Sequence, residues 1–126
     1  MKKIVESPLA PAPIGPYSQA VVANGVVYIS GQIPIDQATG NLVTGSIEEE
    51  TEQVMKNLGY ILEAAGSGFD KVLKCSIFIK NMGDFAKINA VYGTRFQSNP
   101  PARETVQVSE LPKGVNIEIS CVALVD

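Results

Sequence analysis

Two amphipathic helix patterns, spaced among strand patterns, limit this chain to a sheet that helices cover on one face. The first pattern opens at Ser46 as a capping box, has acidic residues at 48–50 that are expected to be solvated, and stops at Gly66. The second follows Asp84, the expected N-cap, and cannot continue past Pro100. The apolar stripes comprise Val54, Leu58, Ile61, Leu62 and Ala65 in the first helix and Phe85, Ile88, Tyr92 and Phe96 in the second.

Five further segments have the alternation or β-branched content of strands. Asn24-Gly25, the strongest two-residue hairpin signal, joins the first two of them. The strands are expected at 19–23, 26–33, 72–79, 102–108 and 116–124. The order β-β-α-β-α-β-β predicts one α+β domain over residues 1–126, with a single sheet and both helices on one face. The proline-rich segment 7–16 is expected to pack as an ordered arm.

Composition excludes several kinds of chemistry. The chain has no histidine, which removes Ser-His-Asp and Cys-His catalysis and histidine metal sites. Its cysteines, Cys75 and Cys121, are too few for a four-cysteine zinc site and are expected to be inert core thiols. A net charge of −3 argues against a nucleic-acid partner. No export signal or membrane-length apolar run is seen, so a cytoplasmic protein is expected.

Strand alternation predicts what each face of the sheet carries. The face toward the helices is expected to carry Leu73, Cys75, Ile77, Val106, Val108, Ile117, Ile119, Cys121 and Ala123. The opposite face is expected to carry Tyr28, Ser30, Gln32, Ser76, Phe78, Arg103, Thr105, Gln107, Glu118, Ser120, Val122 and Leu124. This second face is too apolar for solvent and too polar for a core. It predicts a homo-oligomer with its sheets facing inward and small-molecule sites at the subunit clefts.

Arg103 and Glu118 are the leading candidates for chemistry. The planar guanidinium of Arg103 can bind a carboxylate through two parallel hydrogen bonds, and an interface ion pair with Glu118 or Glu104 is an equal alternative. Glu118 lies in a strand with few charges, where a carboxylate can orient or deprotonate a water. The alternative for Glu118 is a structural pairing with Arg103 or Lys74.

Four other positions have both a functional and a structural interpretation. Ser30-Gly31 ends a strand, where glycine allows close approach of a ligand or marks a bulge. The hydroxyl of Tyr17 can contact a ligand, although aromatic residues in such arms more often pack. Asn89 lies off the apolar stripe of the second helix, where most asparagines are solvated.

Several segments together resemble the Rid family, also called YjgF or L-PSP, and most closely its RidA subfamily of reactive intermediate deaminases. The match runs in order through almost the whole chain. It comprises 12–20 (APIGPYSQA), 30–34 (SGQIP), 53–66, 89–92 (NAVY), 101–103 (PAR) and 111–119 (LPKGVNIEI). Each fragment alone is weak, but the set is specific.

The resemblance implies a chorismate-mutase-like fold and a homotrimer with three sites between subunits. It implies hydrolysis of 2-imino acids, such as 2-iminobutanoate and 2-iminopropanoate, to 2-keto acids and ammonia without a cofactor. Arg103 would hold the substrate carboxylate, and Glu118 would help to hold the attacking water. The remaining ligand-site positions implied by the family are Tyr17, Ser30, Gly31, Asn89 and Thr105.

One position departs from the family pattern. Thr105 stands where many bacterial members have cysteine, which excludes a thiol role there, and Glu104 replaces a small residue. Two other functions remain alternatives: a non-catalytic, ligand-binding regulatory trimer, and the endoribonuclease or translation inhibitor of the older family label. The acidic composition and the absence of histidine argue against the second.

Overall fold

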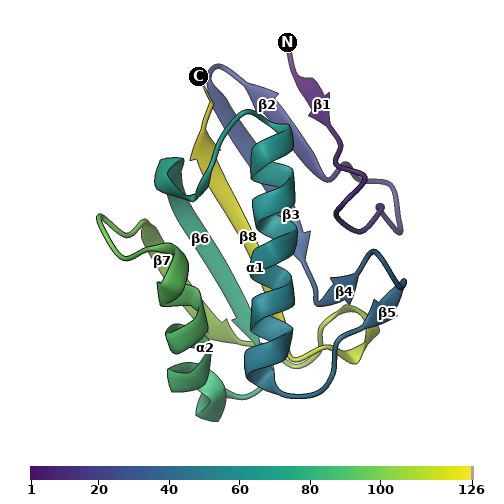
Figure 1. Cartoon of the computed structure of the whole chain (residues 1–126), viewed down its shortest axis with the longest axis vertical. Helices are drawn as coiled ribbons and strands as arrows, with labels where there is room; N and C mark the ends of the chain where they lie inside the picture. Colours follow the sequence, from purple (N-terminus) through teal and green to yellow (C-terminus); the bar gives the residue numbers. More distant parts are fainter. Residues whose placement is uncertain (126) are drawn as a thin grey trace.

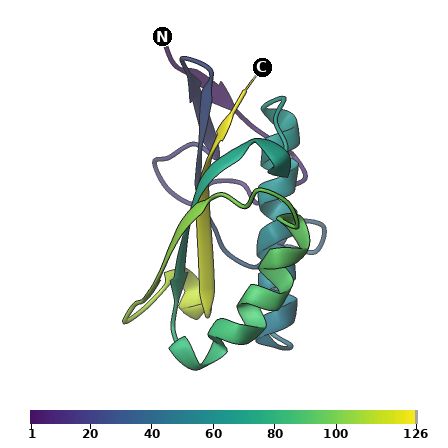
Figure 2. The ribbon, with the colours of Figure 1, turned by 90° about the vertical axis from the view of Figure 1, so that its left-hand side faces the viewer.

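The computed structural model describes residues 1–125 as one mixed, six-stranded sheet with both α-helices on the same face (Figures 1 and 2). The strands of this sheet are β1 (Lys3–Val5), β2 (Ala20–Ala23), β3 (Val26–Gln32), β6 (Val72–Ile79), β7 (Ala102–Gln107) and β8 (Ile117–Leu124). Their order is β1-β2-β3-β8-β6-β7, with β6 and β7 parallel and all other neighbours antiparallel. The predicted α+β class and the two helices on one face are confirmed.

Three short strands have no counterpart in the sequence prediction. β1 pairs with β2, and β4 (Ile35–Asp36) forms a separate two-stranded ribbon with β5 (Asn41–Leu42). Strands of two or three residues are too short to show an alternating pattern, so sequence periodicity could not reveal them. The ribbon follows β3 directly and lies beside the part of the molecule that contains the candidate site (Figure 1).

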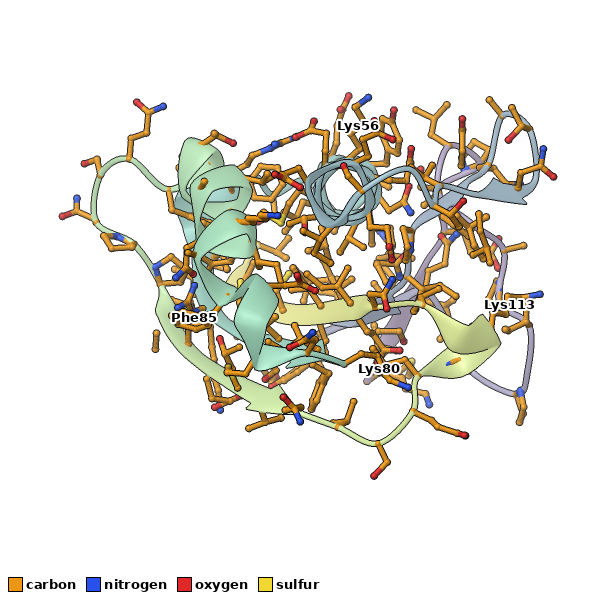
Figure 3. The ribbon with its side chains drawn as sticks, turned by 90° about the horizontal axis from the view of Figure 1, so that it is seen from below. Lys56, Lys80, Phe85 and Lys113 are labelled. Atoms are coloured by element: carbon orange, nitrogen blue, oxygen red, sulfur yellow. The ribbon has the colours of Figure 1, made fainter. Side chains whose placement is uncertain are left out.

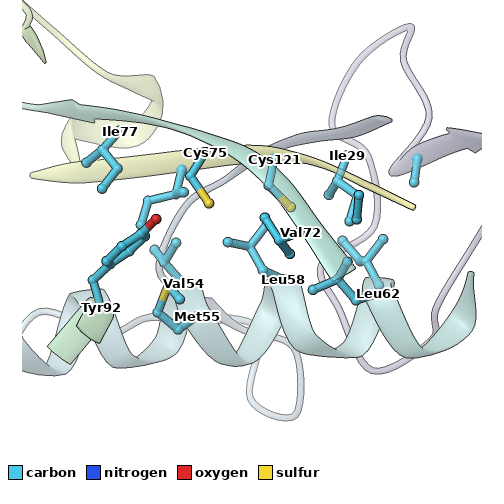
Figure 4. Close-up of a cluster of buried hydrophobic side chains, with 14 of the residues drawn as sticks. Ile29, Val54, Met55, Leu58, Leu62, Val72, Cys75, Ile77, Tyr92 and Cys121 are labelled. Atoms are coloured by element: carbon cyan, nitrogen blue, oxygen red, sulfur yellow. The ribbon is translucent and has the colours of Figure 1, made fainter. Parts of the chain in front are cut away.

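Helix α1 (Ile47–Ala64) follows its sequence signals closely. The Ser46 hydroxyl accepts a hydrogen bond from the backbone N–H of Glu49 at 3.1 Å, as an N-cap requires. The helix ends where Gly66 adopts a φ of 76°, and the Ser67 N–H bonds back to the Leu62 carbonyl at 2.8 Å. Its apolar face packs on the sheet, and Figure 4 shows Leu58 and Leu62 directed toward Cys121 and Val72.

Helix α2 (Phe85–Tyr92) is shorter than its pattern suggests. The expectation that Asp84 caps it is wrong, because that side chain makes no capping bond and belongs to a preceding 3₁₀ turn, η2 (Met82–Asp84). Asn81 begins that turn by accepting the Gly83 N–H at 2.8 Å. The α-helix stops at Tyr92, well before Pro100, and continues as a second 3₁₀ turn, η3 (Gly93–Arg95), where glycine lowers helix propensity.

The predicted face of β7 is wrong. Parallel pairing sets Arg103 beside Cys75 and Thr105 beside Ile77, and those two β6 residues are buried beneath the helices. Arg103 and Thr105, with Gln107, therefore lie on the helix face, while Val106 is 42% exposed on the other. The error arose because β7 is an edge strand whose apolar residues, Ala102 and Val106, both lie on the face away from the helices, so its apolar side is not the core side.

A bulge in β6 makes the prediction for Leu73 wrong. Val72 pairs with Ala123 and Lys74 with Val122, so Leu73 is the extra residue and is exposed rather than buried. The other inward positions of β6 and those of β8 are as predicted, and Cys75 and Cys121 lie side by side in the core (Figure 4). Burial raises the pKa of both thiols, which agrees with the prediction that they are inert.

The sheet face away from the helices carries exposed apolar side chains. Tyr28 is 53% and Leu124 46% exposed, and both lie on this face with Val106. Among residues 1–125, no α-helix covers this face (Figure 2). A mixed face of this kind fits a partner surface better than solvent.

The proline-rich arm is ordered by one buried side chain. Gln19 accepts the Ser7 N–H at 2.6 Å, and its amide donates to the carbonyls of Ser7, Ala10 and Pro11 at 2.9–3.3 Å. The predicted packing is therefore confirmed at Ser7, Ala10 and Pro11, whereas residues 12–16 are exposed on this chain. This arm brings Ile14 and Tyr17 to the end of β3.

We expect Gln19→Ala to lower the free energy of unfolding by about 1–3 kcal/mol, because it leaves buried backbone groups without partners. Chemical denaturation measures this loss. Gln37→Ala, at an exposed position, is the matched control and should change stability by less than about 0.5 kcal/mol. Equal stabilities of the two variants would contradict the anchoring role of Gln19.

Candidate active site

A pocket of about 310 Å³ opens at the ends of β3 and β8. Three segments meet there: the arm, the bulged end of β3 and the connection into β8. The lining residues are Ile14, Tyr17, Ser30, Gly31, Ile33, Pro112 and Glu118. Four predicted site residues, Tyr17, Ser30, Gly31 and Glu118, therefore come together in one place.

Gly31 is required by the position of Glu118. The register of β3 against β8 shifts between Ile29 and Gln32, which confirms the predicted bulge. A Cβ at position 31 would overlap the Glu118 carboxylate. The group that approaches the Gly31 backbone closely is therefore the Glu118 side chain. Half-burial raises the pKa of Glu118, and the carboxylate has no hydrogen-bond partner among residues 1–125. Both oxygens are therefore available to a water or a ligand.

The neighbouring hydroxyls have complementary hydrogen-bonding capacity. The Tyr17 hydroxyl oxygen accepts the Ile14 N–H at 3.2 Å, which leaves the hydroxyl hydrogen free to donate. The Ser30 hydroxyl donates to the Ser18 carbonyl at 2.6 Å, which leaves its oxygen free to accept. The pocket therefore offers one donor and several acceptors to a small polar molecule.

Helix α1 supports two walls of the pocket with polar side chains that the sequence prediction missed. The Asn57 amide donates to the carbonyls of Ile33 and Ile35 at 3.2 and 3.0 Å, and so holds the chain that leaves β3. Glu50 holds Asn116 at the start of β8 and is only 3% exposed, so the expectation of a fully solvated acidic turn is wrong. The available signal was that Asn57 sits at helical spacing within the apolar stripe.

Arg103 lies in a second group, between β7 and α2. Its Nη1 donates to Asn89 Oδ1 at 2.7 Å, so Asn89 is not merely solvated as expected. The guanidinium carbon lies 5.0 Å from the centre of the Tyr92 ring and 5.5 Å from that of Phe85. Thr105 lies on the same face, and its buried hydroxyl has no hydrogen-bond partner among residues 1–125.

The predicted ion pairs of Arg103 do not form. Glu104 instead pairs with Lys74 at 3.1 Å and bonds to Ser76 on the opposite face of the sheet. Arg95, the other arginine, is held by both oxygens of Glu52 at 2.5 and 2.8 Å. Arg103 is therefore the arginine left without a carboxylate in the described chain, which favours its interpretation as a ligand clamp.

One chain does not bring the two groups together. Glu118 pairs with Phe78 on the open face, whereas Arg103 lies on the helix face of an edge strand. Figure 3 shows that the two groups also lie far apart across the width of the sheet: Phe85, beside Arg103, and Lys113, next to the pocket residue Pro112, are at opposite sides of the view. The prediction that Arg103 and Glu118 share a face is wrong, because it assigned the apolar side of β7, which carries Val106, to the helix face.

Comparison with known proteins identifies the family. Residues 7–125 match the family described as Endoribonuclease L-PSP. The chain belongs to this family, which is also called YjgF or Rid. The sequence is 45% identical over 124 residues to the mouse 2-iminobutanoate/2-iminopropanoate deaminase, covering 98% of this chain and 92% of the mouse protein.

Solved Rid structures have the same fold. A Rid family protein of Yersinia pestis, described as of unknown function, superposes with a TM-score of 0.97 at 47% identity, over 99% of this chain and all of the other. TdcF of Escherichia coli, solved with bound serine, superposes with a TM-score of 0.92 at 37% identity. The Rid fold expected from the sequence is therefore confirmed. No helix within residues 1–125 is long and apolar enough to cross a membrane.

The TdcF superposition spans 98% of this chain and 99% of the TdcF chain. The family match over residues 7–125 includes the arm, both helices and every strand of the six-stranded sheet except β1, and it includes every residue of the pocket and of the Arg103 group. Within residues 1–125, no three cysteine, aspartate or glutamate side chains gather closely enough to hold a metal ion.

The raised pKa of Glu118 predicts how stability depends on pH. The folded protein binds the Glu118 carboxyl proton more tightly than the unfolded chain does. Protonation of Glu118 therefore stabilises the fold fully below the ordinary carboxyl pKa, and this stabilisation is lost as pH rises through the raised pKa of the folded protein. We expect Glu118→Gln, which cannot ionise, to have a higher free energy of unfolding than the wild type at pH 7. The difference should vanish below about pH 4.

Denaturant titrations at several pH values measure this effect. Glu110→Gln, at an exposed carboxylate, is the control and should follow the wild type. A Glu118→Gln protein no more stable than the wild type at pH 7 would show that burial does not penalise this carboxylate.

Proposed function

We propose that this protein hydrolyses 2-imino acids, such as 2-iminobutanoate and 2-iminopropanoate, to 2-keto acids and ammonia. The observation that carries the proposal is an arginine fork without a carboxylate partner, in a chain that also holds an unpartnered carboxylate in a pocket. These are the groups needed to bind an imino acid and to activate a water. The mouse relative, named for this reaction, supports the same substrate class.

We further propose that the working site forms between subunits of a homotrimer. Arg103 and Glu118 lie on opposite faces of one sheet, so a single chain cannot apply both to one small substrate. A neighbouring subunit packed on the exposed apolar face can place its Arg103 group opposite the Glu118 pocket. Cyclic assembly of three chains would then make three equivalent sites.

Arg103 would bind the substrate carboxylate. Asn89 occupies one side of the guanidinium, and the rings of Tyr92 and Phe85 flank it, so the fork is held in a defined orientation. The other guanidinium N–H groups make no hydrogen bond to residues 1–125 and can donate to a carboxylate in parallel. Fixing the carboxylate holds C2 of the imine in place for attack.

Glu118 would transfer protons during hydrolysis. Water adds to C2 of the protonated imine as Glu118 accepts one of its protons, which gives a tetrahedral amino alcohol. Glu118 then returns this proton to the amino group, and the C–N bond breaks to release ammonia. As ammonia leaves, the C2 hydroxyl gives its proton back to the Glu118 carboxylate, and C2 becomes the carbonyl carbon of the keto acid. Because Glu118 must start ionised, turnover should fall as pH drops through its raised pKa.

The first test is imine hydrolysis. An L-amino-acid oxidase generates the imine, semicarbazide competes for it, and loss of semicarbazone reports turnover. We expect Arg103→Ala to lower kcat/KM by about 100-fold or more, because the carboxylate loses its clamp. Arg95→Ala, which removes the arginine already bound by Glu52, is the control and should retain activity. A folded wild-type protein that binds carboxylates but hydrolyses no imine would favour the ligand-binding alternative.

The second test asks which chains supply the site. Arg103→Ala and Glu118→Gln chains, each inactive alone, are mixed under conditions that exchange subunits. In a cyclic trimer, each mixed assembly has one site with both wild-type groups, so equal mixing should restore about a quarter of the wild-type rate. No recovery from verified mixed trimers would show that both groups act from one chain.

A further inference from the structure

A buried carboxylate on the far side of the sheet holds the wall that carries Glu118. We propose that Glu50 is a positioning residue, which acts through Asn116 to keep Glu118 against Gly31. This inference rests on the proposed function, since it assigns Glu50 a part in the same reaction without contact to the substrate.

Glu50 binds Asn116 at two points. Its Oε1 accepts the backbone N–H of Asn116 at 3.1 Å, and its Oε2 accepts the side-chain amide at 2.7 Å. The Asn116 carbonyl in turn accepts the Lys80 N–H at 3.1 Å. Both backbone polar groups and the side chain of Asn116 are therefore fixed, two residues before Glu118.

The chain around Asn116 needs such an anchor. On one side, Lys113 and Gly114 have φ values of 57° and 69°, so the segment turns sharply just after the pocket residue Pro112. On the other side, the Glu118 carboxylate has no hydrogen bond of its own within residues 1–125. The place of Glu118 is therefore set by its backbone, and Asn116 fixes that backbone where β8 begins.

A carboxylate suits this task better than a neutral side chain. Two N–H groups converge on Glu50, and a carboxylate accepts both, whereas an amide can accept only one and presents a donor to the other. Burying a carboxylate costs free energy unless it is well hydrogen-bonded, and Glu50 is 3% exposed. Its place in the first turns of α1, near the positive end of the helix dipole, reduces that cost.

The two contacts allow a reciprocal exchange. Glu50→Gln places an amide donor against the donors of Asn116, and Asn116→Asp sets two carboxylates together. In the double variant, the new glutamine amide donates to the new aspartate, and its oxygen accepts the backbone N–H. Both hydrogen bonds are thus restored with the partners reversed. Glu48→Gln, at an exposed position of the same helix turn, is the matched control.

The double variant is expected to recover the kcat and the pH profile that the single variants lose. Glu50→Gln should lower kcat by about 10- to 100-fold, as displacement of a reacting group does, with KM changed by less than about threefold. The acid limb of its pH profile should move to lower pH, because a displaced Glu118 gains solvent and its raised pKa falls toward the ordinary value. The double variant should regain most of kcat and the original limb.

A readout independent of turnover separates this inference from the proposed function. NMR titration of the Glu118 carboxyl carbon should show a lower pKa in Glu50→Gln and recovery in the double variant, whether or not the protein hydrolyses imines. An inactive wild type with these shifts would remove the proposed function and leave the positioning role. A folded Glu50→Gln protein with an unchanged Glu118 pKa and an unchanged kcat would overturn the inference. A Glu50→Gln protein that is less stable but has the wild-type Glu118 pKa and kcat would also overturn it.

Discussion

The parallel pairing of β7 with β6 decides which side of the sheet Arg103 occupies. Because Arg103 lies beside Cys75, its side chain projects toward α2, where Asn89 and two aromatic rings hold it. Glu118, on the antiparallel strand β8, projects the other way into its pocket. This separation divides the polar groups of one chain between two faces, and it is the reason that the proposed site needs two subunits.

The Glu118 half of the site is fixed by contacts from elsewhere in the fold. Gln19 holds the arm that brings Tyr17 to the pocket, and Asn57 holds the chain after β3. The carboxylate of Glu118 fits because Gly31 has no Cβ, and half-burial without a partner raises its pKa. A group that is costly to ionise in the folded protein is thereby kept ready to exchange a proton.

Much of the fold could be read from local patterns. Ser46 and Gly66 mark the ends of α1 by capping chemistry, and Asn24-Gly25 marks the hairpin, because these signals act within a few residues. Residue type and strand position made Arg103 and Glu118 candidates with structural alternatives, and the resemblance to the Rid family favoured their functional roles. Asn57 and Glu50 were missed, since their partners lie more than twenty residues away along the chain.

The sequence by itself determined the helices, the principal strands, the α+β class and the identity of the arginine and carboxylate on which the proposed chemistry depends. Only the tertiary structure decided that Arg103 and Glu118 face apart, that Arg95 is already bound by Glu52, and that Glu50 holds Asn116. The physical reason is that capping and periodicity depend on neighbours in the chain. The direction of an edge-strand side chain and the partner of a buried charge depend on pairing between distant segments.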